Sequence, residues 1–139
     1  MQDWRPPHAY VPGQTPRHAE ALFDPFKQIA DPLEASPAWS LGLNLLQDGY
    51  FWEAHELLEP VWMAAPENSG TKCLVQGVIQ LANARLKVRM DRPRAAARLL
   101  LQARGLLDEA FVRGGACLMG LTRKDADRMY EESRRECVL

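Results

Sequence analysis

The chain has 139 residues, of which 47% are hydrophobic, and its formal net charge is −1. This length suits one domain with a sizeable core, while the near-neutral charge gives no electrostatic footprint for nucleic acid and no support for a polybasic membrane anchor. No apolar run approaches the roughly 20 residues that span a bilayer, and the N-terminus lacks the layout of a signal peptide. Cys73, Cys117 and Cys137 are far apart and without CxxC spacing, which predicts reduced, mostly packing cysteines in a cytoplasmic protein.

Proline dominates the first 36 residues, which hold six of the ten prolines in the chain. Because proline fixes φ and donates no amide hydrogen, residues 1–36 are predicted to form an extended arm with one short helix around residues 17–23. His8 and His18, both in the arm, are predicted to be exposed loop residues. Residues 37–139 are predicted to form a single helical domain on which the arm packs through four aromatic anchors: Trp4, Tyr10, Phe23 and Phe26.

Hydrophobic periodicity predicts an all-α fold of about five helices, paired as antiparallel hairpins in a loosely tetratricopeptide-like manner. Ser36 followed by Pro37 is typical of a helix start, and Thr122 followed by Asp125 resembles a capping box. No segment shows convincing strand alternation. The last helix has an apolar side that could serve a homodimer. The helices are predicted at about residues 37–47, 50–64, 71–90, 92–112 and 122–136.

Candidate functional residues are concentrated in the second helix, in the run Gly49-Tyr50-Phe51-Trp52-Glu53-Ala54-His55-Glu56-Leu57-Leu58-Glu59. On a helical wheel its apolar residues share one side, while the opposite arc carries acids and an imidazole between Trp52 and Trp62. Pro60 removes one helical hydrogen bond, which predicts a kink that frees the carbonyl of Glu56. The polar residues of that arc are Glu53, His55, Glu56 and Glu59. This mixture predicts a site rather than a plain solvated surface.

The third helix is apolar around nearly its whole circumference, which is typical of a central, buried helix. One narrow polar line runs down it: Lys72, Gln76, Gln80, Asn83 and Lys87. Buried amides must find hydrogen-bond partners, and a short loop makes this helix the antiparallel neighbour of the second one. A polar cleft is therefore predicted between the two helices.

The motif from Gly49 to Glu59, with Trp62 after it and Gln76-Gly77-Val78-Ile79-Gln80-Leu81-Ala82 downstream, resembles a known family. This is domain-of-unknown-function family 309, a small all-helical bacterial and archaeal group sometimes labelled predicted metal-dependent hydrolase. The likeness covers about residues 40–108. It implies an all-α fold of helical hairpins. It implies little about function, because the hydrolase label is itself an inference from the His/Glu motif.

Two chemical interpretations of the motif are open. His55, Glu56 and Glu59 stand on adjacent turns and could ligate a divalent metal ion, although a complete site usually needs three or four protein ligands. Without a metal, His55 and Glu56 could work as an acid–base pair. No nucleophile motif accompanies them, and Cys73 is better explained as a packing residue than as a nucleophile.

Two further interpretations involve no catalysis. Glu53 and the other polar residues of its arc could bond Lys72, Gln76, Gln80 and Lys87 and thereby fix the register of two helices. A cleft lined by Trp52, Trp62 and His55 could instead bind a cationic peptide or small molecule. Against that binding role, the proline-rich arm could cover both tryptophans.

The leading hypothesis is a helical protein with a small-ligand or metal site of hydrolase-like chemistry. In it, His55 and Glu56 are catalytic, and the divalent metal ion would be held by His55, Glu56 and Glu59. The ligand would be a small molecule or peptide, with no role for nucleic acid or membrane. The rival hypothesis is a non-catalytic protein-interaction module in which the cluster is structural. The candidate ligand-binding residues are Glu53, Trp52, Trp62, Gln76, Gln80 and Asn83.

Overall fold

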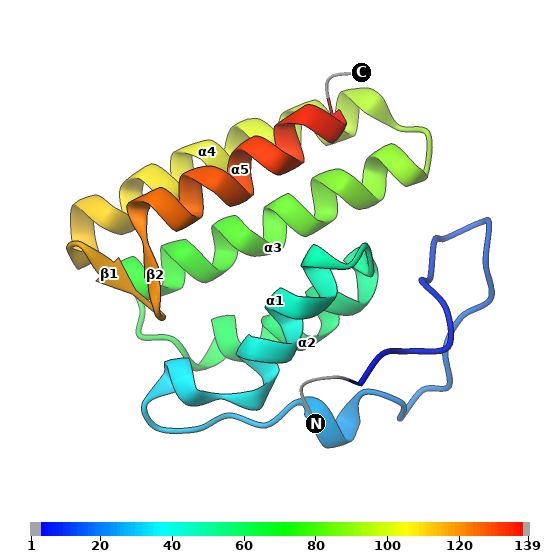
Figure 1. Ribbon diagram of the computed structural model, residues 1–139, viewed down its shortest axis with the longest axis horizontal. Coiled ribbons are helices and arrows are strands. Elements are labelled where there is room, and N and C mark those ends of the chain that lie inside the picture. The colour runs from blue at the N-terminus through cyan, green and yellow to red at the C-terminus, as the bar shows by residue number, and fades with distance from the viewer. Residues whose placement is uncertain (1–3, 138–139) are drawn as a thin grey trace.

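A computed structural model describes residues 4–137 and contains five α-helices and one small β-hairpin (Figure 1). The prediction of an all-α fold is confirmed, apart from that hairpin. Helices α3, α4 and α5 lie side by side, the α1–α2 pair lies below them, and the arm runs around one end (Figure 1). The helices are α1 (Pro37–Gln47), α2 (Phe51–Ala64), α3 (Gly70–Arg89), α4 (Pro93–Gly114) and α5 (Arg123–Cys137), and the strands are β1 (Cys117–Leu118) and β2 (Leu121–Thr122).

The predicted helix boundaries agree with the structure to within two residues. Helix α1 begins at Pro37, directly after the extended Ser36. Gly49 has a φ of 92°, a conformation that glycine adopts without strain, and it turns the chain from α1 into α2. Helix α2 continues through Pro60 to Ala64.

Helix α5 begins with the reciprocal capping box that the sequence predicts. The backbone N–H of Thr122 donates to Oδ2 of Asp125 over 2.9 Å, and the backbone N–H of Asp125 donates to Oγ1 of Thr122 over 3.2 Å. The bond from the Thr122 amide, and then that from the Arg128 side chain, holds the pKa of Asp125 below its ordinary value. The local sequence therefore determines where this helix starts.

The β-hairpin is the one regular element that the sequence did not predict. Each strand has only two residues, so no alternation of apolar and polar side chains can develop. Met119 and Gly120 turn the chain with φ values of 54° and 77°. The indole Nε1–H of Trp39 donates to the carbonyl of Met119 over 3.0 Å, so the hairpin is fastened to α1.

Helix α3 is central, as its all-round apolar sequence predicts, because it packs along α4 and against both α2 and α5. Glycine permits the close approach of α3 to α4 at two points. A Cβ on Gly77 would lie 2.8 Å from Cδ2 of Leu107, and a Cβ on Gly70 would lie 2.5 Å from the carbonyl oxygen of Ala110. Among residues 4–137, no helix has the length and apolar character needed to traverse a membrane.

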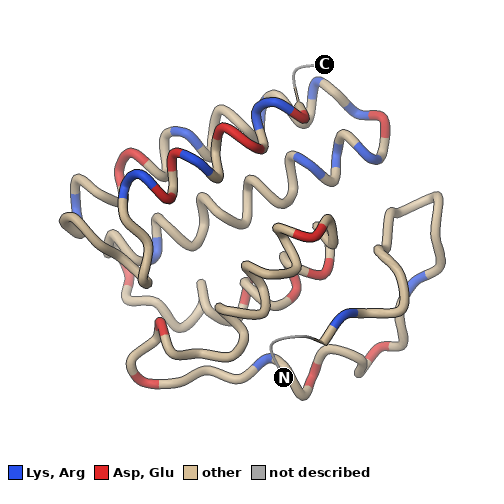
Figure 2. The backbone as a smooth tube through the Cα atoms, in the orientation of Figure 1, with Lys and Arg blue, Asp and Glu red and all other residues tan. Residues whose placement is uncertain are grey.

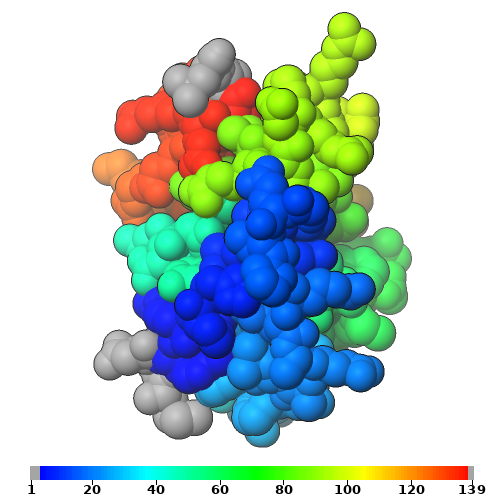
Figure 3. Space-filling model, turned by 90° about the vertical axis from the view of Figure 1, so that its right-hand side faces the viewer, coloured from blue at the N-terminus to red at the C-terminus, as the bar shows by residue number. Residues whose placement is uncertain are grey.

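The arm covers one face of the molecule, where it lies against α1 and α2 (Figure 3). It contains two 3₁₀-helices, Asp24–Phe26 and Leu33–Ala35. The prediction of a short helix around residues 17–23 is wrong: residues 17–19 have no regular structure and residues 20–23 form a turn. The segment buries only one apolar residue, Phe23, which does little to offset the cost of helix nucleation.

Charge is divided unequally between the two parts of the chain (Figure 2). Residues 1–69 hold ten acidic and three basic residues, whereas residues 70–139 hold eight acidic and fourteen basic residues. In Figure 2 the basic positions lie mainly along α3, α4 and α5, with several around the turn between α3 and α4. The net charge of −1 therefore conceals an acidic part and a basic part.

Two glycine substitutions should change stability in opposite directions. Gly70→Ala introduces a Cβ against the backbone of α4, which cannot move aside like a side chain, and we expect a loss of about 1–3 kcal/mol. Gly105→Ala, on the exposed side of α4 with no atom within 4 Å of the new Cβ, should gain up to about 1 kcal/mol from helix propensity. Urea unfolding measures both, and a Gly70→Ala protein of unchanged stability would contradict the close contact.

Candidate functional site

The centre of the candidate site is the buried carboxylate of Glu53, on the first turn of α2. Glu53 is 0% exposed, although the helical wheel placed it on the polar arc. Its Oε2 accepts a hydrogen bond from the backbone N–H of Tyr10 over 2.6 Å and another from Nε2 of His18 over 2.6 Å. A buried charge must be paired or hydrogen-bonded, and here both donors come from the arm.

His18 is a buried partner of this carboxylate, so the prediction that it is an exposed loop residue is wrong. Its side chain is only 2% exposed. The ring packs against Phe23 at a centroid distance of 5.3 Å and against Trp52 at 6.1 Å, and the His8 ring lies over it at 4.6 Å. His8 is half-buried rather than exposed, and its Nε2 lies 2.7 Å from the carbonyl oxygen of Pro16.

The contact between His18 and Glu53 determines which hydrogen-bonding atoms of each side chain remain available. A carboxylate accepts, so Nε2 of His18 carries the hydrogen of this bond; when the ring is neutral, Nδ1 is then the nitrogen with a free lone pair. Among the hydrogen bonds of residues 4–137, Nδ1 of His18 has no partner. The second oxygen of Glu53, Oε1, is buried and likewise has no partner among those residues. The pair thus combines an oriented imidazole with unused acceptor capacity.

A cleft of about 490 Å³ adjoins this pair, between the arm and α2. His18 and Trp52 form part of its wall, and the guanidinium-bearing Arg17 contributes from the arm. The Tyr10 ring meets the Trp52 ring edge-on at 5.1 Å. The carboxylates at the cleft belong to Glu20 and Glu56. Of the site residues predicted from sequence, Trp52 and Glu56 line this cleft, and Glu53 lies behind it.

His55 lies apart from the cleft lining, on the outer side of α2. Its Nε2 is 3.1 Å from Oε2 of Glu59, and its Nδ1 is 3.8 Å from Oε1 of Glu56. The two carboxylates therefore flank different edges of one ring, so the three groups do not converge on a single point. Glu56 also lies 3.6 Å from Nζ of Lys27, a competing cation.

The arrangement of these side chains does not fit a three-ligand metal centre. Within residues 4–137, no three histidine, cysteine, aspartate or glutamate side chains are placed to hold one ion. The metal role of His55, Glu56 and Glu59 stays a prediction.

The predicted hydrogen-bond network between α2 and α3 is wrong in its partners. Glu53 is bonded to the arm, and the amide of Asn83 donates to Gln80 on its own helix over 3.3 Å. Gln76, Gln80 and Asn83 are half-buried on α3. The arm supplies the hydrogen-bond donors of Glu53. The polar side chains of α3 are therefore not needed as its partners.

The two tryptophans of the motif occupy different environments. Trp52 is half-buried under the arm, beside Tyr10 and Phe23. Nζ of the buried Lys72 lies 4.2 Å from the centroid of the Trp62 ring, and it also lies 2.9 Å from Oε1 of Glu67. Trp62 therefore packs with the start of α3, away from the cleft.

The cysteines contribute no nucleophile to the cleft. Within the described chain all three are free; Cys73 and Cys137 are half-buried and Cys117 is exposed. Burial raises the pKa of the Cys137 thiol. Cys73 lies on α3 and is not part of the cleft lining, in keeping with the prediction of a packing role.

Six residues that line the cleft were not among the predicted site residues, and all belong to the arm: Tyr10, Arg17, His18, Ala19, Glu20 and Phe23. One signal could have found His18. It stands among the aromatic anchors of a segment expected to pack on α2, and a buried acid such as Glu53 needs a donor. Neither periodicity nor spacing could connect His18 with Glu53, because the two residues are 35 positions apart and His18 lies in an irregular segment.

Comparison with known proteins identifies one similarity. Residues 39–99 match the model of the family described as Domain of unknown function (DUF309), so the predicted resemblance is confirmed. The match runs from α1 through α2 and α3 into α4, and it contains Trp52, Glu53 and Glu56. The residues that the arm contributes to the cleft lie outside it. No curated protein and no solved structure matches the chain.

Replacement of Glu53 tests the tie between the arm and α2. Glu53→Gln removes the charge that accepts two hydrogen bonds in a buried setting, and we expect the free energy of unfolding to fall by about 1–3 kcal/mol. Glu59→Gln is the matched control, since its side chain is 54% exposed on the same helix and should change stability by less than about 0.5 kcal/mol. Equal effects in urea unfolding would contradict a special role for Glu53.

Metal titration tests the remaining metal hypothesis. Because the donors around His55 do not converge, we expect calorimetric titrations of zinc, manganese and iron to show no stoichiometric binding. The titrations are run on untagged protein and on His55→Ala. A one-to-one complex that is lost in His55→Ala would establish the metal site despite the geometry seen here.

Proposed function

We propose that this chain binds a small zwitterionic molecule with an aromatic or aliphatic body in the cleft between the arm and α2. We further propose that the His18–Glu53 pair exchanges a proton with the bound molecule. The observation that carries the proposal is the buried imidazole at the cleft wall, oriented by a buried carboxylate and left with a free Nδ1.

The lining of the cleft supports this class of ligand. A volume of about 490 Å³ falls within the range of small-molecule sites. Arg17 and Glu20 have no ion-pair partner among residues 4–137, so a guanidinium and a carboxylate remain available for the two charges of a zwitterion. The faces of Trp52 and Tyr10 supply aromatic surface for an apolar body.

The chemistry that such a site can support is proton transfer. A histidine whose second nitrogen is held by a carboxylate is oriented as a general base or acid. The lining includes no serine, threonine or cysteine, so hydrolysis there would require water as the nucleophile, activated at Nδ1 of His18. Hydrolase-like chemistry is thus compatible with the site, and ligand binding is the property that the observations support more directly.

A comparison of three probes tests the ligand class. Phenylalanine carries both charges, phenethylamine lacks the carboxylate, and phenylpropionate lacks the ammonium. We expect phenylalanine to shift the NMR signals of the Trp52 indole and the His18 ring, with affinity about tenfold higher than either analogue, because each charged group adds one charge-assisted contact.

Two variants and one control complete the test. Arg17→Gln and Glu20→Gln should each weaken phenylalanine binding about tenfold, whereas Arg98→Gln, exposed on α4, should leave it unchanged. Absence of any shift at Trp52 and His18 with all three probes would reject the small-ligand proposal. It would leave the interaction-module hypothesis, in which the arm simply completes the packing of α2.

A further inference from the structure

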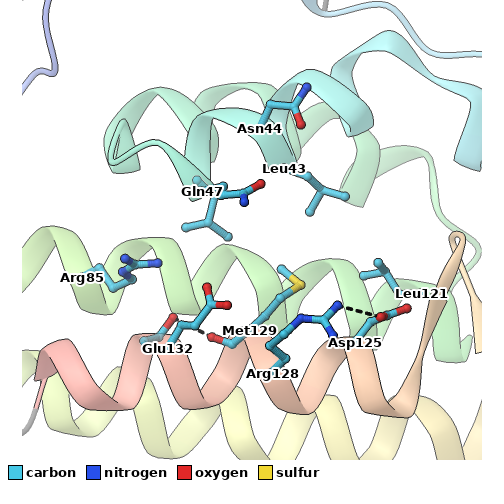
Figure 4. Close-up of a pocket in the computed structure, with 11 residues that line it drawn as sticks. Leu43, Asn44, Gln47, Arg85, Leu121, Asp125, Arg128, Met129 and Glu132 are labelled. Atoms are coloured by element: carbon cyan, nitrogen blue, oxygen red, sulfur yellow. Dashed lines mark hydrogen bonds and ion pairs between the residues drawn. The ribbon is translucent and has the colours of Figure 1, made fainter.

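A second hollow lies on another side of the α1–α2 pair, between α1 and α5 (Figure 4). It measures about 290 Å³, and the turn into α5, together with the side chain of Arg85 from α3, closes its two ends. None of the predicted site residues lines it. The groove thus brings together two segments that are far apart in the sequence, since Leu43 on α1 and Met129 on α5 are separated by 86 positions.

The apolar part of this groove comes from both helices. Leu43 and Leu46 contribute from α1, Leu121 from β2, and Met129 from α5. Leu46 is buried, and the other three are half-buried, so they present apolar surface to the hollow. In Figure 4 the Met129 side chain points from α5 toward α1. A ligand in the groove would therefore need an apolar body.

The charges in the groove are not equally available. Arg128 lies 2.8 Å from Oδ1 of Asp125, and Arg85 lies 2.9 Å from Oε2 of Glu136, so both arginines are already paired. Glu132 has no hydrogen-bond or ion-pair partner within residues 4–137. Its carboxylate points toward α1, in the direction of Gln47 (Figure 4). The free charge of this groove is therefore a single negative one.

We propose that the groove between α1 and α5 is a binding site for a small aliphatic amine. The ammonium group would pair with Glu132 and donate to the side-chain oxygen of Gln47, which is also without a partner in the described chain. The alkyl chain would cover Leu43 and Met129. The volume of about 290 Å³ lies at the small end of ligand sites, which favours a short monoamine over a larger molecule.

Hexylammonium is the probe for this site, and the methyl group of Met129 is the reporter. In protein labelled with carbon-13 at the methionine methyls, we expect a saturable shift of the Met129 signal. Met63, which is 69% exposed, should not shift and serves as the internal control. Hexanol should bind about tenfold more weakly and hexanoate more weakly still, because neither can form the ion pair.

The role of the free carboxylate is tested by a matched pair on α5. Glu132→Gln should weaken hexylammonium binding about tenfold. Glu131→Gln makes the same change at the next position, where the carboxylate is paired with Arg134 and does not line the groove, and affinity should be retained.

Three outcomes would overturn this proposal: no shift at Met129, equal affinity for hexanol and hexylammonium, or equal losses in both variants. The reporter and the variants are independent of Arg17 and Glu20. Rejection of the amine site would therefore not affect the proposal for the cleft beside Trp52, and rejection of that proposal would not affect the amine site.

Discussion

The pairing of one buried carboxylate with two donors of the arm is the constraint on which the rest of the site depends. Glu53 is fully buried on α2, and its Oε2 accepts from the Tyr10 backbone and from His18. Leaving such a charge unpaired in the interior is expensive, so the arm must lie where both donors reach it. The position of the arm in turn places Arg17 and Glu20 beside Trp52 and creates the cleft.

The α1–α2 pair forms one wall of each of two hollows, and the two hollows have different linings. On the α2 side, the arm adds an imidazole and charges of both signs. On the α1 side, α5 adds an apolar wall and one unpaired carboxylate, that of Glu132. Both hollows arise where an element outside the matched stretch of residues 39–99 meets an element within it. The surrounding segments, rather than the matched hairpins alone, therefore decide what the molecule can bind.

The helices could be predicted from the sequence because their signals are local. The start at Pro37, the turn at Gly49 and the capping box at Thr122 each depend on residues only a few positions apart. The central place of α3 also followed from its all-round apolar composition. These features need no knowledge of distant contacts.

The site could be predicted only in part, because its partners come from irregular segments. The motif helix was correctly singled out, and Trp52 and Glu56 do line a cleft. The wheel placed Glu53 on the polar arc facing a cleft with α3, however, because it could not show that the arm packs over Glu53 and supplies its partners. His18 was predicted to be exposed because it lies in an irregular segment. The groove at Met129 has no sequence signal, since its two walls are far apart in the sequence.

The unequal division of charge affects which part of the molecule a charged surface attracts. With ten acids and three bases before Gly70, and fourteen bases and eight acids from there on, the protein has two oppositely charged parts and almost no net charge. An anionic surface would therefore attract the part of the molecule that contains α3, α4 and α5 more strongly than the acidic part that precedes it in the chain.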